Sequence, residues 1–226
     1  MSIFRNELKE ICDEEWSKIK KGKFYTLVLN EDEPDVDLYI SAMIQVFHYT
    51  KNNSINQAIA TYAEDHKKVG LLHFAMKHAI EELGHENMVV HDLKSIGVDE
   101  SVFLDQPIPA TEALNGYLDS ISLRGGVIPR LGYSFWAEDS YEHLAPLLNL
   151  CKNKLKLDDD QLTFFIEHAE IDMHHSKDVN DAIDEWVTSD ADKKNVKQVA
   201  RTTLYLTGRI LESVAEDYMN NKGNEY

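Results

Sequence analysis

The chain is predicted to fold as an all-α protein, and two observations support this prediction. Apolar residues recur at helical rather than alternating spacing, which is typical of amphipathic helices. Glycine and proline stand mostly where such segments would stop, as they do at helix ends. The chain has 226 residues, of which 43% are hydrophobic. That is enough to bury a sizeable core in one domain, which we expect to span residues 1–226.

Eight helical segments are expected, and residues at their ends justify most of them. In order they cover about residues 3–20, 35–51, 54–65 in short pieces, 68–96, 111–125, 129–155, 160 through the second histidine run described below, and 191–220. Asp35 is a typical N-cap for the second segment, and Asp158–Asp160 for the seventh. Gly97 is a typical C′ residue after the long fourth segment. Pro129 is an N1-type proline in the sixth segment, which Pro146 should kink or divide.

Charge and cysteine content exclude several kinds of partner and site. The net charge of −17 would repel nucleic acid and anionic membrane surfaces. The two cysteines, Cys12 and Cys151, form no CxxC pair, so neither a disulfide framework nor a thiolate zinc site is indicated. The N-terminus is charged, and no run approaches the roughly 18 apolar residues of a membrane span. We therefore expect a cytoplasmic protein without a signal peptide.

The pattern His-x-x-x-acid-x-x-His occurs twice, in HAIEELGH and in HAEIDMHH. Its six residues are His78, Glu82, His85, His168, Asp172 and His175. On an α-helix, positions i, i+4 and i+7 fall within about 60° of one another, so each run would point three potential metal ligands from one face. Neutral imidazole and carboxylate together suit iron, manganese or zinc. Surface or hydrogen-bonded core histidines would explain either run alone, but the repeated geometry favours a metal site.

Glu138 and His48 are further candidate ligands. Carboxylate metal sites in helical bundles usually add a glutamate from each of two more helices to a pair of Glu-x-x-His motifs. Glu138 lies 34 residues before Asp172, in YSFWAED, where an unpaired acid is costly to bury. The same offset before Glu82 leads to His48, which suggests two related helix pairs in a bundle with pseudo-twofold internal symmetry. A solvated acid and an ordinary core histidine are the alternative interpretations.

A family resemblance is carried by HAIEELGHENMVVHDLKSIG, the proline-containing connection after it, LGYSFWAE and HAEIDMHH. Over about residues 35–185 the chain resembles the haem-oxygenase-like iron-containing redox enzymes. Their superfamily also holds TenA-type thiaminase II and pyrroloquinoline-quinone synthase. The resemblance implies a haem-oxygenase-like helical bundle around a central cavity, with His78 as a ligand or a residue behind the ligands. It implies iron ligands at Glu82, His85, Glu138, His168, Asp172 and His175.

The resemblance also implies that non-haem iron activates dioxygen to oxidise a small organic substrate. Two iron ions are expected. Relatives often carry a glutamate on the second helix, where this chain has Gln45 and His48, so a single ion or manganese is the alternative. Other interpretations are a metal-free enzyme of the TenA or pyrroloquinoline-quinone synthase kind and a non-catalytic small-molecule-binding protein. Fold analogy further predicts a homodimer.

Several aromatic residues are candidates for lining a pocket that takes an apolar or aromatic substrate. They are Tyr39, Phe47, Tyr49, Phe74, Tyr133, Phe135 and Trp136. Aromatic residues at helical spacing usually belong to an ordinary core, which is the alternative interpretation. Cys151, near a helix end, lacks the nearby acids of a thiaminase nucleophile.

Overall fold

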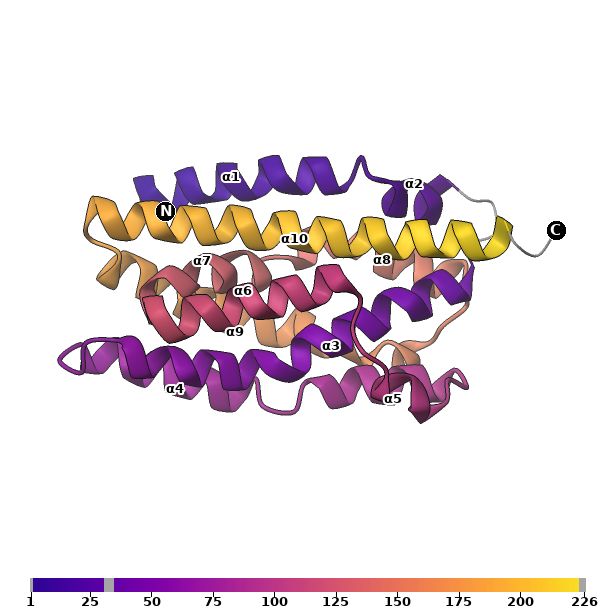
Figure 1. The fold of residues 1–226 in the computed structure, drawn as a ribbon, viewed down its shortest axis with the longest axis horizontal. Coiled ribbons are helices and arrows are strands. Elements are labelled where there is room, and N and C mark those ends of the chain that lie inside the picture. Colours follow the sequence, from indigo (N-terminus) through magenta and orange to yellow (C-terminus); the bar gives the residue numbers. More distant parts are fainter. Residues whose placement is uncertain (1, 31–34, 224–226) are drawn as a thin grey trace.

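The protein is an elongated bundle of α-helices (Figure 1). We describe it from a computed structural model, in which the described residues are 2–30 and 35–223, without the side chains of residues 30, 141–142, 169–173 and 223. The α-helices of this part are α1 (Ile3–Ile19), α2 (Lys23–Asn30), α3 (Val36–Ala60), α4 (Val69–Glu81), α5 (Glu86–Ser95), α6 (Pro109–Gly125), α7 (Val127–Ala137), α8 (Tyr141–Asn153), α9 (Thr163–Trp186) and α10 (Asp190–Gly223). Short 3₁₀ helices are η1 (Thr61–Ala63), η2 (Glu100–Leu104) and η3 (Asp159–Gln161). No strand occurs among the described residues, so the all-α prediction is confirmed.

The longest helix, α10, runs along most of the molecule (Figure 1). Helices α1 and α2 lie along one side of it, and α7, α6 and α3 also pack against it. At the opposite edge of the bundle, α4 and α5 pack against α3. Helix α9 contacts α4, α5 and α7. This arrangement brings the two histidine runs and the end of α7 onto neighbouring elements.

Helix α7 is held very close to α10. Its residues from Val127 to Trp136 are all buried. A Cβ atom on Gly132 would lie 2.2 Å from the carbonyl oxygen of Val196 and 2.9 Å from the backbone nitrogen of Ala200. Only glycine permits so close an approach of two backbones. The position of α7 along α10 is therefore restricted to the register that places Gly132 at this contact.

Two apolar clusters stabilise the bundle. The larger joins α1, α2, α3, α4, α6, α7, α9 and α10, with Leu131 and Leu204 among its fully buried members. The smaller joins α3, α5 and α8 to the segment before α9, with Met43, Leu93 and Leu162 at its centre. Full burial of one such side chain contributes about 1.5–3 kcal/mol. The second cluster therefore anchors the start of α9.

Several expected helix ends are confirmed by their local geometry. The Asp35 side chain accepts a hydrogen bond from the Asp37 backbone at 2.9 Å, as an N-cap does. Gly97 has φ +90° directly after the last turn of α5. The terminal helix is also confirmed, as α10.

Other expected boundaries are wrong. The segment 68–96 is two helices rather than one, and the segment 129–155 divides at residues 138–140 rather than at Pro146, which lies inside α8. The pieces expected over 54–65 are the end of α3 followed by η1, and α2 occupies a stretch in which no helix was expected. Asp158 caps η3 and not α9, because its side chain accepts from the Gln161 backbone.

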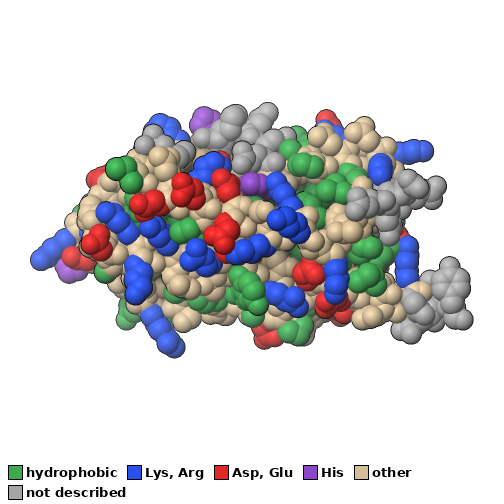
Figure 2. Space-filling view, turned by 90° about the horizontal axis from the view of Figure 1, so that it is seen from above, with side chains coloured by type: hydrophobic (Ala, Val, Ile, Leu, Met, Phe, Trp, Pro, Cys, Tyr) green, Lys and Arg blue, Asp and Glu red, His purple; other side chains and the backbone are tan. Residues whose placement is uncertain are grey.

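Charged side chains of both signs are interspersed on the face that Figure 2 shows. Ion pairs one turn apart also occur on α1, where Lys18 Nζ lies 3.0 Å from the Glu14 carboxylate. Exposed pairs of this kind add only about 0.3–0.5 kcal/mol each. Within the described part of the chain, no helix has both the length and the apolar composition needed to cross a bilayer.

Candidate metal centre

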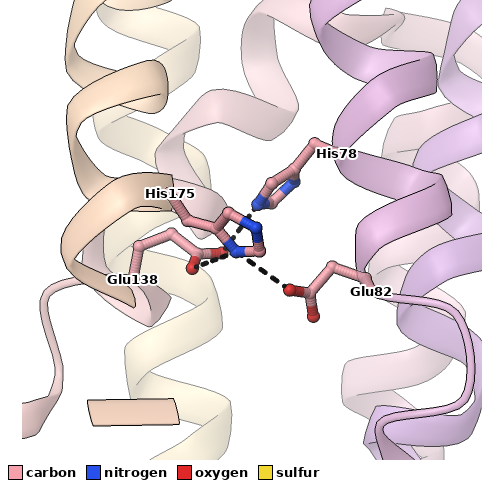
Figure 3. Close-up of side chains that lie close together, drawn as sticks. All are labelled: His78, Glu82, Glu138 and His175. Carbon is pink, nitrogen blue, oxygen red and sulfur yellow. Dashed lines mark ion pairs between the residues drawn. The ribbon is translucent and has the colours of Figure 1, made fainter. Parts of the chain in front are cut away.

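Four buried side chains from three helices converge inside the bundle (Figure 3). His78 comes from α4, Glu82 and Glu138 are the C-cap residues of α4 and α7, and His175 comes from α9. One ligand-type atom of each lies within 4.8 Å of the others. His175 Nδ1 is 3.1 Å from Glu82 Oε1 and 3.4 Å from Glu138 Oε2. Four of the candidate ligands are thus brought together.

The first histidine run does not lie on one continuous helix. Helix α4 ends at Glu81 and α5 begins at Glu86, with Gly84 between them at φ +94°. This left-handed conformation favours glycine and ends the helix. Glu82 and His85 therefore stand at a C-cap and an N-cap, and the expectation that the run shares one helical face is wrong.

The break places His85 in a second group of potential ligands, with Glu82 and His168. His85 Nδ1 lies 3.4 Å from Glu82 Oε2, and the rings of His85 and His168 have centroids 4.8 Å apart. Glu82 belongs to both groups, because its Oε1 faces His175 and its Oε2 faces His85. The two groups therefore adjoin through one carboxylate.

The second histidine run lies on an unbroken helix, α9. His168 Nδ1 is 2.6 Å from the carbonyl oxygen of Phe164. A carbonyl can only accept, so this bond places the proton on Nδ1 and leaves Nε2 with a free lone pair. Metal-binding histidines commonly have this arrangement, in which a backbone carbonyl orients the ring. The side chain of Asp172, the remaining member of the run, lies outside the described part of the structure.

Asp92, which sequence reasoning did not select, caps the helix that carries the second run. Its fully buried carboxylate accepts from the backbone N–H groups of Thr163 and Phe164, each at 2.9 Å. The Thr163 hydroxyl donates to the same carboxylate at 2.5 Å. Helix α5 therefore supplies the N-terminal cap that α9 lacks in its own sequence, and the start of α9 is tied to the element that follows His85.

A buried amide network, also missed from the sequence, supports the first group from α3. Arg130 is 2% exposed and donates to Asn53 Oδ1 at 2.6 Å, Asn56 Oδ1 at 2.9 Å and Gln57 Oε1 at 2.5 Å. Asn53 Nδ2 in turn donates to Glu82 Oε2 at 3.3 Å. An arginine within the apolar stretch VIPRLGY was the available signal, because a buried guanidinium requires such partners.

This network also sets the orientation of His78. Since Gln57 Oε1 accepts from Arg130, its amide nitrogen faces His78 Nδ1 at 2.6 Å and donates to it. A neutral His78 then carries its proton on Nε2, which lies 3.3 Å from Glu138 Oε1. His78 thereby presents an N–H group to the centre, facing Glu138 Oε1 without the alignment of a full hydrogen bond, and in this tautomer it offers no lone pair there.

The atoms of the centre fit a cation. His85 Nδ1 and His175 Nδ1 are buried and have no hydrogen-bond partner among the described residues. Each lies 3.1–3.4 Å from a carboxylate oxygen without the alignment of a hydrogen bond. Buried nitrogens are normally hydrogen-bonded, so unpaired ones that converge with carboxylates indicate ligand positions for a metal ion.

Electrostatics favour the ionised carboxylates that a metal requires. Burial alone would raise the pKa of Glu82 and of Glu138, but the close imidazoles of His175 and of a second histidine outweigh it, so both pKa values lie below the ordinary one. Burial lowers the pKa of His175, but Glu138 and Glu82 outweigh this effect and raise it to about 10. Burial and the nearby His85 lower the pKa of His168, which favours the neutral imidazole that binds metals.

His48 and Gln45 lie apart from both groups of ligand atoms. His48 is fully buried, with Nδ1 3.3 Å from Lys51 Nζ and its ring against Phe47. Gln45 accepts a hydrogen bond from the Thr111 hydroxyl at 2.8 Å and so joins α3 to α6. The offset of 34 residues therefore brings Glu138 to the centre but does not bring His48 there.

Comparison with known proteins agrees with the fold. A solved structure from Shewanella denitrificans, described as a domain of unknown function with a haem oxygenase-like fold, is 34% identical, with a TM-score of 0.91 over 96% of this chain and 94% of that one. A TenA homologue from Pseudomonas syringae has a TM-score of 0.76 at 12% identity over 95% and 93% of the two chains. A CADD-like protein of unknown function from Nostoc punctiforme has a TM-score of 0.71 at 15% identity over 94% and 97%.

Sequence comparison gives a more specific result. A search of curated proteins found no significant match. Residues 53–208, which contain every member of the two ligand groups, match the model of a family described as iron-containing redox enzymes. The resemblance inferred from the two histidine runs and LGYSFWAE is thus confirmed. The chain belongs to the iron-containing redox enzyme family and has the haem oxygenase-like fold.

Proposed function

We propose that the protein is a non-haem oxidoreductase that holds two iron ions side by side and uses dioxygen to oxidise a small organic substrate. The observation that carries the proposal is the carboxylate of Glu82, whose two oxygens face different histidines. Ions in two-metal sites lie about 3.5–4 Å apart, a separation that one shared carboxylate can span. Membership of the family supports iron as the metal.

Each position has its own donor set. Glu82, Glu138 and His175 would hold one ion. The other would be held by Glu82 with His85 and His168, two histidines and one carboxylate, which is the donor set of many non-haem iron oxygenases. Asp172 is proposed as a further ligand from its place in the second run. Ferrous iron bound here would supply the electrons with which dioxygen is activated.

The surrounding side chains shield the centre on one side and leave it accessible on the other. The ring of Phe74 stacks on His78 with centroids 5.7 Å apart, and the ring of Phe164 lies 4.2 Å from that of His168. A polar cleft of about 510 Å³ reaches His85 and His175 from the surface. We assign this cleft as the route by which ions and dioxygen reach the centre.

A metal-free enzyme of the TenA kind is less well supported. Such an enzyme would use a cysteine nucleophile, and the thiolate is the reactive form. Cys151 is buried, and burial raises the pKa of its thiol to about 12. The TenA homologue from Pseudomonas syringae is only 12% identical and so supports the fold alone.

Iron content tests the proposal. Protein loaded with ferrous iron and purified without oxygen should contain about two iron ions per chain by plasma mass spectrometry and should consume dioxygen when mixed with it. Glu82→Ala should lose both ions, whereas Glu112→Ala, which removes an exposed acid from α6, should retain them. A wild-type protein that takes up no metal would contradict the proposal. A single ion that survives Glu82→Ala would contradict the shared carboxylate, and uptake of manganese in preference to iron would contradict the choice of metal.

A further inference from the structure

A second feature of the interior is an apolar cavity of about 140 Å³ enclosed by α1, α2, α3, α7, α8, α9 and α10. Much of its wall is aromatic, with Trp16, Phe24, Tyr39, Tyr49 and Trp136 among its members. An apolar cavity of about 150 Å³ in another protein stays dry and binds benzene. The space here therefore matches about one aromatic ring.

Two hydroxyl groups line this cavity without hydrogen-bond partners among the described residues. They are Tyr39 Oη and Thr207 Oγ1, and both atoms are buried. Burial raises the pKa of Tyr39, so its hydroxyl keeps its proton and can donate. An unpaired buried hydroxyl costs about 1–3 kcal/mol, which a bound molecule with one polar group would offset.

The charges around the cavity exclude a negatively charged occupant. The described lining contains no Lys or Arg, and none of the residues outside the described part is basic in sequence. The lining includes one carboxylate, Asp35, which already bonds to Tyr218 Oη and Lys222 Nζ, each at 2.7 Å. A buried carboxylate ligand would lack a counter-charge here, which carries a large desolvation cost.

The cavity and the metal centre share a wall. Phe164 lines the cavity, and its ring lies 4.2 Å from the ring of His168. Trp136 and Ser140 also line the cavity, and between them in the chain stands Glu138 of the centre. A molecule held in the cavity would therefore lie one side-chain layer from the ligands.

We propose that this cavity binds the substrate of the enzyme, an uncharged aromatic molecule of about one ring that carries a single hydroxyl or carbonyl group. Tyr39 and Thr207 supply the two hydroxyls of the lining that can pair with this group. The assignment of the bound molecule as substrate rests on the proposed iron-dependent function, whereas the existence and selectivity of the binding site do not.

Calorimetric titration of both metal-free and iron-loaded protein tests the proposal, with para-cresol, toluene and benzoate as probes. Para-cresol should bind, toluene more weakly because it leaves both hydroxyls unpaired, and benzoate at least about tenfold more weakly than para-cresol. Tyr39→Phe and Thr207→Val, which nearly preserve side-chain volume, should each weaken para-cresol binding by roughly five- to tenfold. Tyr62→Phe is the matched control, because Tyr62 is 88% exposed.

A variant that fills the cavity separates this site from the metal centre. Ala42 lines the cavity, and Ala42→Phe should abolish para-cresol binding while iron content stays at the wild-type value. Benzoate binding equal to that of para-cresol, or unchanged binding in both hydroxyl variants, would overturn the proposal, as would iron-loaded protein that binds no para-cresol. Selective para-cresol binding to a protein that takes up no iron would instead support the site and overturn only the iron-dependent function.

Discussion

The two histidine runs have the same spacing and different structures. In the second, His168 and His175 lie on the unbroken helix α9. In the first, Gly84 interrupts the run, so His78 lies on α4 and His85 stands at the N-cap of α5. The shared spacing of the two runs therefore predicts that they carry the same types of ligand, but it does not predict that they have the same backbone geometry. The break lets the first run contribute to both groups of ligands, with Glu82 at the point where the groups meet.

The two runs are also supported differently. Side-chain amides of α3 and the guanidinium of Arg130 hold the first, through Gln57 on His78 and Asn53 on Glu82. A backbone carbonyl holds His168 in the second, where the helix itself supplies the orienting group. His78 accepts a hydrogen bond from an amide, so it presents an N–H group to the centre. His168 donates to a backbone carbonyl, so it presents a lone pair instead.

Replacing one histidine from each run should give the largest contrast. His175→Ala removes a ligand and should abolish one iron position. His78→Ala removes a residue that lies against Glu138 behind the ligands, and losses of such supporting residues typically weaken metal affinity about 10–100-fold without changing the number of ions at saturation. Iron titration with spectroscopic readout measures both quantities. If His78→Ala lost a full equivalent of iron at saturation, His78 would be a ligand and the inferred position of its proton would be wrong.

Removing the cap of α9 should destabilise the second run. Asp92→Ala leaves two backbone N–H groups and the Thr163 hydroxyl without their buried partner, so we expect a loss of about 2–4 kcal/mol of unfolding free energy. Chemical denaturation of metal-free protein measures the loss. Asp99→Ala is the control, since it removes an exposed cap from η2 and should cost about 1 kcal/mol or less. Equal costs for the two variants would argue against Asp92 as a special support of α9.

Removing the helix break tests the first run. At Gly84 the backbone has φ +94°, so Gly84→Ala should cost about 1–3 kcal/mol and should weaken iron binding through displacement of His85. Gly116→Ala is the matched control inside α6, where a Cβ meets nothing within 4 Å. That variant should increase stability by about 0.5–1 kcal/mol. Thermal denaturation should show shifts of opposite sign, and two shifts in the same direction would contradict the role of Gly84.

The smallest effect expected is a pH dependence of the α9 cap. Burial raises the pKa of Asp92, so the folded protein binds this proton more tightly than the unfolded chain does. The contribution of Asp92 to stability should then be fully present below the ordinary pKa of about 4 and should decline as the pH rises through the folded value. Denaturation of wild type and Asp92→Asn across this range, without metal, isolates the contribution. A difference that grows with pH would show that the pKa is lowered instead.

The residues of the centre were more predictable than their arrangement. Metal ligands can be recognised by residue type alone. His85, Glu138 and His168 could therefore be selected from the two histidine runs and from one acid in an apolar stretch. The break at Gly84 was missed because an isolated glycine can also lie inside a helix. His48 precedes Glu82 by 34 residues, just as Glu138 precedes Asp172, but His48 does not lie at the metal centre. A separation in sequence carries no information about the direction of a side chain.

The supporting residues were harder to predict because they are ordinary in sequence. Asn53 and Gln57 lie within α3 among other polar residues, and only the buried charge of Arg130 makes them essential partners. Asp92 stands 71 residues before the helix that it caps, beyond the reach of local capping patterns. Helix α2 was missed as well, in the segment that leads to α3.

The contact between α7 and α10 has a consequence for evolution of the site. Because Gly132 allows the two backbones to touch, a slip of α7 by one residue would force Leu131 or Tyr133 against the carbonyl oxygen of Val196. Helix α10 contributes no residue to the ligand groups found in the described part of the chain, yet it sets how far along the bundle Glu138 stands. Substitutions on α10 at this contact can therefore alter the distance between carboxylates that they never touch, so a change in metal geometry need not begin with a change of ligand.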